Sequence, residues 1–158
     1  MNIFKKVWKK LFYKPLIFNS MLYPKPGERT RGGRLYRDDV YDEAIQDYME
    51  VVNKGRAFGQ LGYPTGSEAP YEINLTKASH QVTNINKVDG EYNATIQILD
   101  TPAGKDLKSI IKKDSSKIGF SMRAVGSMEM SENGTGIAQK DLKIISFDAT
   151  SQVSPKEK

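Results

Sequence analysis

The sequence of 158 residues contains no cysteine and a single histidine, His80. Without cysteine the chain can form neither a disulfide framework nor a thiolate metal site, which fits a reducing compartment better than secretion. With one imidazole it cannot build a two-histidine metal site, so any imidazole chemistry must use His80. No apolar run approaches the roughly 20 residues that a membrane-spanning helix needs. No apolar segment with a small-residue cleavage site follows the basic amino terminus, so we expect no signal peptide.

Positive charge is concentrated at one end of the chain. The net charge is +5, yet the first 37 residues carry ten Lys and Arg side chains against one acidic residue, Glu28. Residues 3–12 (IFKKVWKKLF) place apolar side chains on one helical stripe and four lysines on the other side. Such a basic amphipathic helix can dock on the body of the protein, a membrane surface, nucleic acid or an acidic protein. We therefore divide the chain into a basic arm and linker (1–30), a folded domain (31–150) and a polar tail (151–158).

Apolar spacing and capping signals predict two helices in the folded domain. The first covers about 39–53, with Asp38 or Asp39 as its cap and apolar residues recurring at helical intervals. The second begins at Thr101-Pro102, where threonine can cap the helix and proline fits its first turn. Residues 19–33 are expected to form a linker or loop.

Strand signals make up most of the remaining domain. Asp89-Gly90 is a strong hairpin signal that joins expected strands at 78–86 and 92–100. Further strands are expected at 117–126 and 142–148, with a hairpin between them that turns at Asn133-Gly134, and 55–70 reads as an ordered loop. This order predicts an α+β fold, built as a small, mostly antiparallel β-barrel or curled sheet with flanking helices.

The segment 117–126 (KIGFSMRAVG) carries the clearest candidate for chemistry. Its alternation places Ser121 and Arg123 on one face of a strand, and Gly119 leaves room for a substrate backbone. A serine hydroxyl becomes a nucleophile only beside a base, and His80 lies on another expected strand. Arg123 could then stabilise an oxyanion. The alternatives are a small polar serine, a structural histidine and a surface arginine.

Five segments in the same order resemble motifs of the tailed-phage prohead protease family, also called head maturation or prohead core proteases. They are GGRLY (32–36), GQLGYP (59–64), Ser79-His80, LDTPAG (99–104) and GFSMRAVG (119–126). The resemblance covers roughly residues 31–150, and the ordered combination is more specific than any one motif. Because this family is distantly related to the herpesvirus assembly protease, the resemblance implies a herpesvirus-protease-like fold.

The resemblance also implies roles for individual residues. The histidine of the Ser-His pair is the family's general base and the serine of the glycine-rich strand its nucleophile, which assigns these roles to His80 and Ser121. The herpesvirus enzyme uses a second histidine as third member, and this chain has none. A carboxylate can orient an imidazole, so we expect Asp148 to do so, with a solvated strand end as the alternative. Arg123 and Gly119 are expected to line the oxyanion or substrate site.

The function implied is that of a serine endopeptidase of phage head maturation. It would cleave scaffold or core protein, segments of the major capsid protein and in some cases itself, inside the procapsid in the host cytoplasm. Acyl transfer through Ser121 and His80 needs no metal and no organic cofactor. The chain could also self-associate, and nucleic acid is not an obligatory partner. The basic arm could dock the protein on an acidic scaffold. Membrane contact through residues 1–14 is a weaker expectation.

Four positions depart from the family pattern, and three of them, Gln60, Tyr63 and Met122, keep a second hypothesis open. Gln60 stands where glutamate is frequent, Tyr63 where histidine is frequent, Met122 where a second serine is common, and Ala124 where glycine is frequent. The chain could therefore be a non-catalytic core or scaffold-binding component of the procapsid that keeps the protease fold. A third hypothesis, a membrane- or nucleic-acid-binding protein driven by the basic helix, leaves the ordered motifs unexplained.

Overall fold

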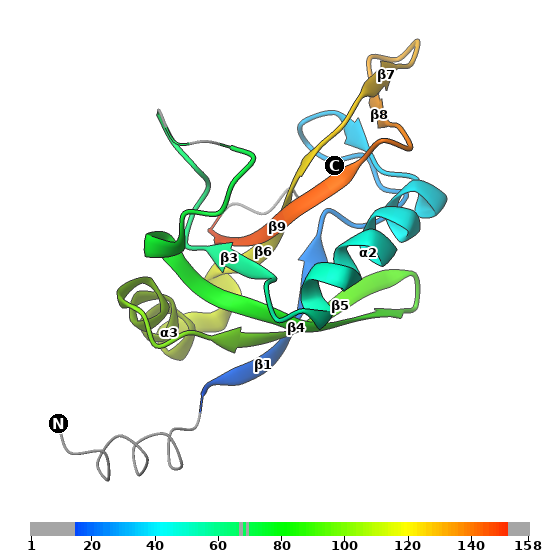
Figure 1. The fold of residues 1–158 in the computed structure, drawn as a ribbon. Coiled ribbons are helices and arrows are strands. Elements are labelled where there is room, and N and C mark those ends of the chain that lie inside the picture. Colours follow the sequence, from blue (N-terminus) through cyan, green and yellow to red (C-terminus); the bar gives the residue numbers. More distant parts are fainter. Residues whose placement is uncertain (1–14, 67, 69, 152–158) are drawn as a thin grey trace, which may run out of the picture.

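The structure is a computed structural model that describes residues 15–66, 68 and 70–151. The amphipathic helix expected at 3–12 and most of the polar tail lie outside the described residues. A curled six-stranded sheet forms the centre of the molecule (Figure 1). Its strands, in spatial order, are β3 (Phe58–Gln60), β4 (Ala78–Val88), β5 (Glu91–Ile98), β1 (Ile17–Tyr23), β6 (Gly119–Val125) and β9 (Lys143–Thr150).

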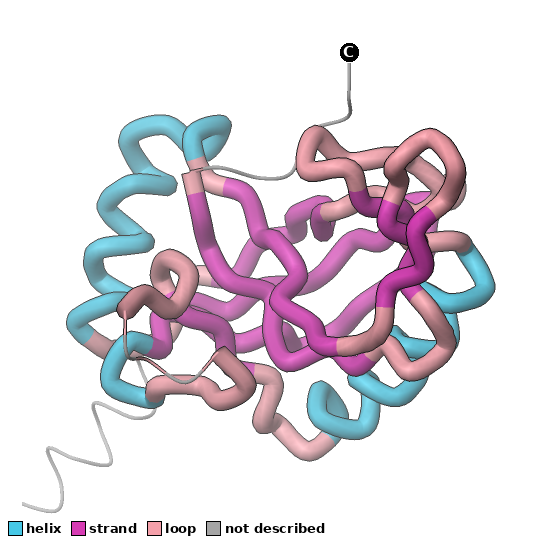
Figure 2. The backbone as a smooth tube through the Cα atoms, turned by 90° about the horizontal axis from the view of Figure 1, so that it is seen from above, coloured by secondary structure: helices cyan, strands magenta, loops and turns pink. Residues whose placement is uncertain are grey.

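The two edges of this sheet meet and nearly close it into a barrel. Neighbouring strands are antiparallel except β1 and β6, which are parallel. Just after β3, Leu61 forms a bridge with Ala149 of β9, and the Gly62 amide donates to the Ala149 carbonyl at 2.7 Å. Seen from above, the strands surround a common interior (Figure 2). The predicted α+β barrel is confirmed.

Two helices flank the barrel on opposite sides (Figures 1 and 2). Helix α2 (Asp38–Asn53) turns an apolar stripe to the core, including Tyr41 and Tyr48. Arg37 precedes α2 without a side-chain cap, and the two aspartates expected as caps lie in the first turn, where they favour the positive helix end. Helix α3 (Pro102–Asp114) begins as predicted, because Thr101 Oγ1 accepts from the Gly104 amide at 2.9 Å. Short 3₁₀ turns cover Leu75–Lys77 and Ser115–Lys117.

A small second sheet lies at one end of the barrel (Figure 1). It contains β2 (Arg34–Leu35), β8 (Gly136–Ala138) and β7 (Met128–Met130), in that spatial order. The antiparallel β7–β8 pair is the hairpin expected at Asn133-Gly134, and Gly134 supplies the positive φ of +80° that the turn requires.

The linker expected over 19–33 is partly wrong. Residues 17–23 form β1, which lies in the middle of the barrel between β5 and β6, and Leu22 is buried in the core. Pro24 and Pro26 suggested a break in the chain, but they follow the strand and only end it. The folded part of the chain therefore includes residues that the sequence assigned to the arm and linker.

Candidate active site

The two faces of β6 meet very different surroundings. Side chains alternate along a strand, so Phe120 and Ser121 point to opposite sides. Phe120 pairs with Ala149 on the core side. On the other side Ser121 lies opposite Asp148, and Arg123 lies opposite Ser146. The sequence predicted correctly that Ser121 and Arg123 share a face.

His80 lies on the core side and is fully buried. Its Nε2 is 2.7 Å from the Phe147 carbonyl oxygen and its Nδ1 is 2.8 Å from Ser79 Oγ. Because a carbonyl only accepts, Nε2 carries the proton and Nδ1 accepts from the Ser79 hydroxyl. The ring packs edge-on against Phe120, with centroids 4.8 Å apart. Burial lowers the pKa of His80 to about 4, so the imidazole is neutral at pH 7 and both nitrogens are occupied.

Gly59 makes room for this imidazole. It lies opposite His80 in the β3–β4 pair. A Cβ atom added at Gly59 would stand 2.1 Å from His80 Nε2 and 2.4 Å from the Phe147 carbonyl oxygen. Only a residue without a side chain fits there, so the histidine is built tightly into the wall of the barrel.

The structure does not bring His80 and Ser121 together. The imidazole contacts Phe120, whose side chain points inward, whereas the Ser121 side chain leaves β6 on the opposite face. The backbone of β6 lies between them, and no hydrogen bond joins these two described residues. In this arrangement the imidazole cannot accept the Ser121 proton.

Asp148 lies on the Ser121 side and is fully buried. Its carboxylate accepts from Arg123 Nε at 2.8 Å, the backbone N–H of Gln60 at 3.0 Å and Ser146 Oγ at 2.9 Å. These bonds compensate a buried charge that would otherwise be costly. No hydrogen bond joins Asp148 to the imidazole, on which it acts only through its charge, and the carboxylate instead binds Arg123.

The Arg123 guanidinium joins β6 to the loop that follows β3. We call the described residues between 61 and 74 of this loop the covering segment. Beside Asp148, it donates to Gln60 Oε1 at 3.0 Å and to the carbonyls of Pro70 and Glu72 at 3.0 and 2.9 Å. A further 3.4 Å contact runs from Nη2 to Asp148 Oδ1. All five guanidinium N–H groups are thus directed at protein acceptors, and none is left for an oxyanion. Gly119, the other expected substrate contact, begins β6 opposite Thr150.

Tyr63 is a side chain in contact with Ser121. Ser121 is 2% exposed and Tyr63 is 41% exposed. Burial raises the pKa of Tyr63, and a hydrogen-bonding contact from Ser121 opposes that rise. The sequence marked Tyr63 only as a departure from a family pattern and did not place it beside the serine.

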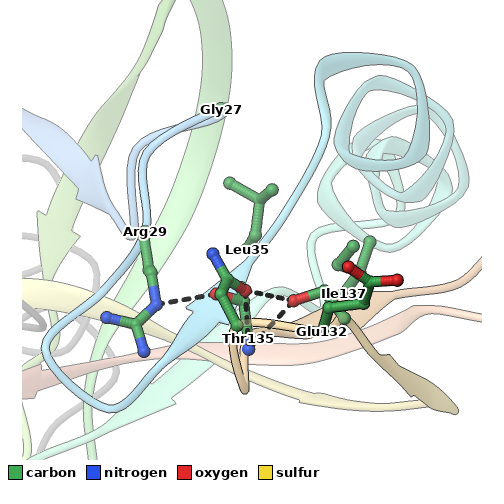
Figure 3. A pocket seen from close by; sticks show the side chains of 8 residues that line it. Gly27, Arg29, Leu35, Glu132, Thr135 and Ile137 are labelled. Carbon is green, nitrogen blue, oxygen red and sulfur yellow. Dashed lines mark hydrogen bonds between the residues drawn. The ribbon is translucent and has the colours of Figure 1, made fainter.

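A separate pocket of about 670 Å³ lies beside the small sheet (Figure 3). Its wall is braced by a 2.8 Å hydrogen bond from Arg29 Nε to Thr135 Oγ1, and none of the expected catalytic residues lines it. Among the described residues, no group of three or more His, Asp or Glu side chains could hold a metal ion. In the same part of the chain, no helix has the length and apolar content to span a bilayer.

Comparison with known proteins identifies a fold. The sequence matches no protein-family model and no curated protein. The structure is similar to that of the capsid assembly protease gp21 of bacteriophage T4, with a TM-score of 0.68 and 18% sequence identity. The match covers 87% of this chain and 98% of that one. The chain therefore has the fold of a phage capsid assembly protease.

Proposed function

We propose that this protein acts in head maturation of a tailed phage, enclosed in the procapsid within the host cell. The shared fold supports this role, because it extends over nearly the whole length of the T4 capsid assembly protease. The ordered motifs from GGRLY to GFSMRAVG support it independently. Since one fold can host several activities, the activity itself must be argued from the site.

The first candidate activity is serine endopeptidase action on scaffold protein, on the major capsid protein or on the chain itself. Ser121 would attack the scissile carbonyl, His80 would take its proton, and Asp148 would be the third member. The protease fold and the Ser121–Arg123 strand support this candidate. It requires His80 to leave two hydrogen bonds and a fully buried site and to reach the opposite face of β6.

The geometry around Ser121 favours the second candidate, a non-catalytic procapsid component with the protease fold. One observation carries this conclusion: the imidazole and the Ser121 hydroxyl lie on opposite faces of the same strand. A serine without an adjacent base is a poor nucleophile at neutral pH. The protein would then bind scaffold or capsid protein through its fold, with Ser121 unactivated.

Cleavage in assembled procapsids distinguishes the two candidates. Procapsids carrying the wild-type chain, Ser121→Ala or the exposed control Ser116→Ala would be isolated, and scaffold, capsid protein and the chain itself examined by mass spectrometry. We expect the same fragments with all three chains. Fragments that are lost only with Ser121→Ala would establish the endopeptidase, whereas a chain that is never packaged would refute the role in head maturation.

A further inference from the structure

We propose that Tyr63 occupies the position from which a base would act on Ser121, and that its phenol keeps Ser121 unreactive. Residue 63, rather than His80, then decides whether this serine is a nucleophile. This inference deepens the proposed function, because it concerns the same serine.

The backbone fixes Tyr63 at this position independently of its side chain. Leu61 forms a bridge with Ala149, and the Gly62 amide donates to the Ala149 carbonyl. Ala149 neighbours Asp148, the residue opposite Ser121. Gly62 has a φ of +84°, a conformation that other residues rarely adopt. The chain therefore turns at residue 62 beside β9, and the next side chain, Tyr63, makes a hydrogen-bonding contact with Ser121 of β6.

The far end of the covering segment is fixed as well. Arg123 holds the carbonyls of Pro70 and Glu72, and Gln60 Oε1 accepts from the Asn74 amide at 3.0 Å. Tyr63 thus lies between two attached ends and contacts Ser121, which is almost inaccessible. The same buried Arg123–Asp148 pair that supports β6 also keeps the cover closed.

A phenol in this position is a poor base. Tyrosine ordinarily ionises near pH 10, and burial raises the pKa of Tyr63 further, so the group is a neutral phenol at pH 7. A neutral phenol accepts a proton far less readily than a neutral imidazole does. Because Tyr63 is partly exposed, it can be replaced without creating a cavity in the core.

The test replaces the phenol by an imidazole and measures reaction of Ser121 with a fluorophosphonate probe, which needs no knowledge of the substrate. In Tyr63→His, the imidazole takes the Ser121 proton, the Oγ–P bond forms, the P–F bond breaks and fluoride leaves. The imidazolium then releases its proton to water. We expect labelling at Ser121 to be about 100-fold or more faster than in the wild type, which is the lower range of general-base catalysis.

Three matched controls define the result. Tyr63→Phe removes the hydroxyl without supplying a base and is expected to stay unlabelled, as is Tyr63→His with Ser121→Ala. Labelling of Tyr63→His should rise as pH rises through the imidazole pKa, ordinarily about 6.5, because only the neutral ring accepts a proton. Equal labelling of Tyr63→Phe would show that uncovering, not a base, had activated the serine and would overturn the proposal.

Two further outcomes would also overturn it. One is a wild-type chain labelled at Ser121 as fast as Tyr63→His. The other is a Tyr63→His chain that unfolds at the wild-type temperature and still remains unlabelled. In that outcome, the NMR titration of the introduced imidazole would also be the same with and without Ser121→Ala. Neither outcome bears on whether the chain is packaged in procapsids, so the inference and the role in head maturation fail separately.

Discussion

The inner and outer faces of β6 bury ionisable groups in opposite ways. On the inner face, His80 packs against Phe120 and is buried as a neutral ring, with one hydrogen bond at each nitrogen. On the outer face, Asp148 and Arg123 are buried as charges that neutralise each other. Burying a charge is costly, and the two faces avoid this cost differently: His80 is neutral, whereas Asp148 and Arg123 are charged and paired. Neither arrangement leaves a free acid or base beside Ser121.

The largest effect is expected when the pair on the outer face is broken. Arg123→Met leaves the buried Asp148 carboxylate without its cation, and losing one member of a buried pair typically costs about 3–5 kcal/mol. Urea unfolding would measure the loss, with Arg56→Met, an exposed arginine, as control. A loss below about 1 kcal/mol would mean that water compensates the carboxylate in place of the guanidinium, and the contrast between the faces would disappear.

The buried His80 on the inner face should make the stability of the protein depend on pH. Because the pKa of His80 is about 4 in the folded protein and about 6.5 in an unfolded chain, the unfolded state binds more protons between these values. Stability should fall as pH falls through 6.5 towards 4, by roughly 3 kcal/mol in total from this group. Unfolding of wild type and His80→Gln would be compared between pH 7.5 and 4.5. Identical pH profiles would show that the imidazole can be protonated in the folded state.

The smallest of the three effects tests how tightly the imidazole is packed. Gly59→Ala forces a Cβ atom against His80 and the Phe147 carbonyl, and overpacking of this kind costs about 1–3 kcal/mol. Gly32→Ala is the matched control, because its added Cβ would meet no atom closer than 3.8 Å. In a His80→Ala background part of the Gly59→Ala cost should disappear. Strict additivity of the two changes in a double-mutant cycle would contradict the contact.

Local signals predicted most of the fold. The strands on either side of Asp89-Gly90 and the helix that begins at Thr101-Pro102 are present, because turn and capping chemistry acts over a few residues. Strand β1 was missed because its place in the sheet depends on pairing with β5 and β6, which are distant in sequence.

The failure to pair His80 with Ser121 has a more specific cause. His80 has the same alternation phase as Val82, an apolar residue, whereas Ser121 has the phase opposite to that of Phe120. The two phases together indicate an inward histidine and an outward serine. The motif resemblance assigns roles by residue type alone and does not include this signal. The contact of Tyr63 with Ser121 could not be predicted in this way, because it depends on the closure of the barrel at Ala149.

The attachment of the covering segment to the Arg123 guanidinium has a consequence for how the protein would open. The described residues between 61 and 74 belong to no helix or strand, so side-chain contacts such as those of Arg123 and the Lys77–Glu68 ion pair hold them in place. A partner that offered carbonyl groups to Arg123 in place of those of Pro70 and Glu72 could release this cover while the barrel stayed intact. An extended polypeptide offers carbonyls along its backbone, so a bound peptide of this kind would compete for Arg123 and expose Ser121.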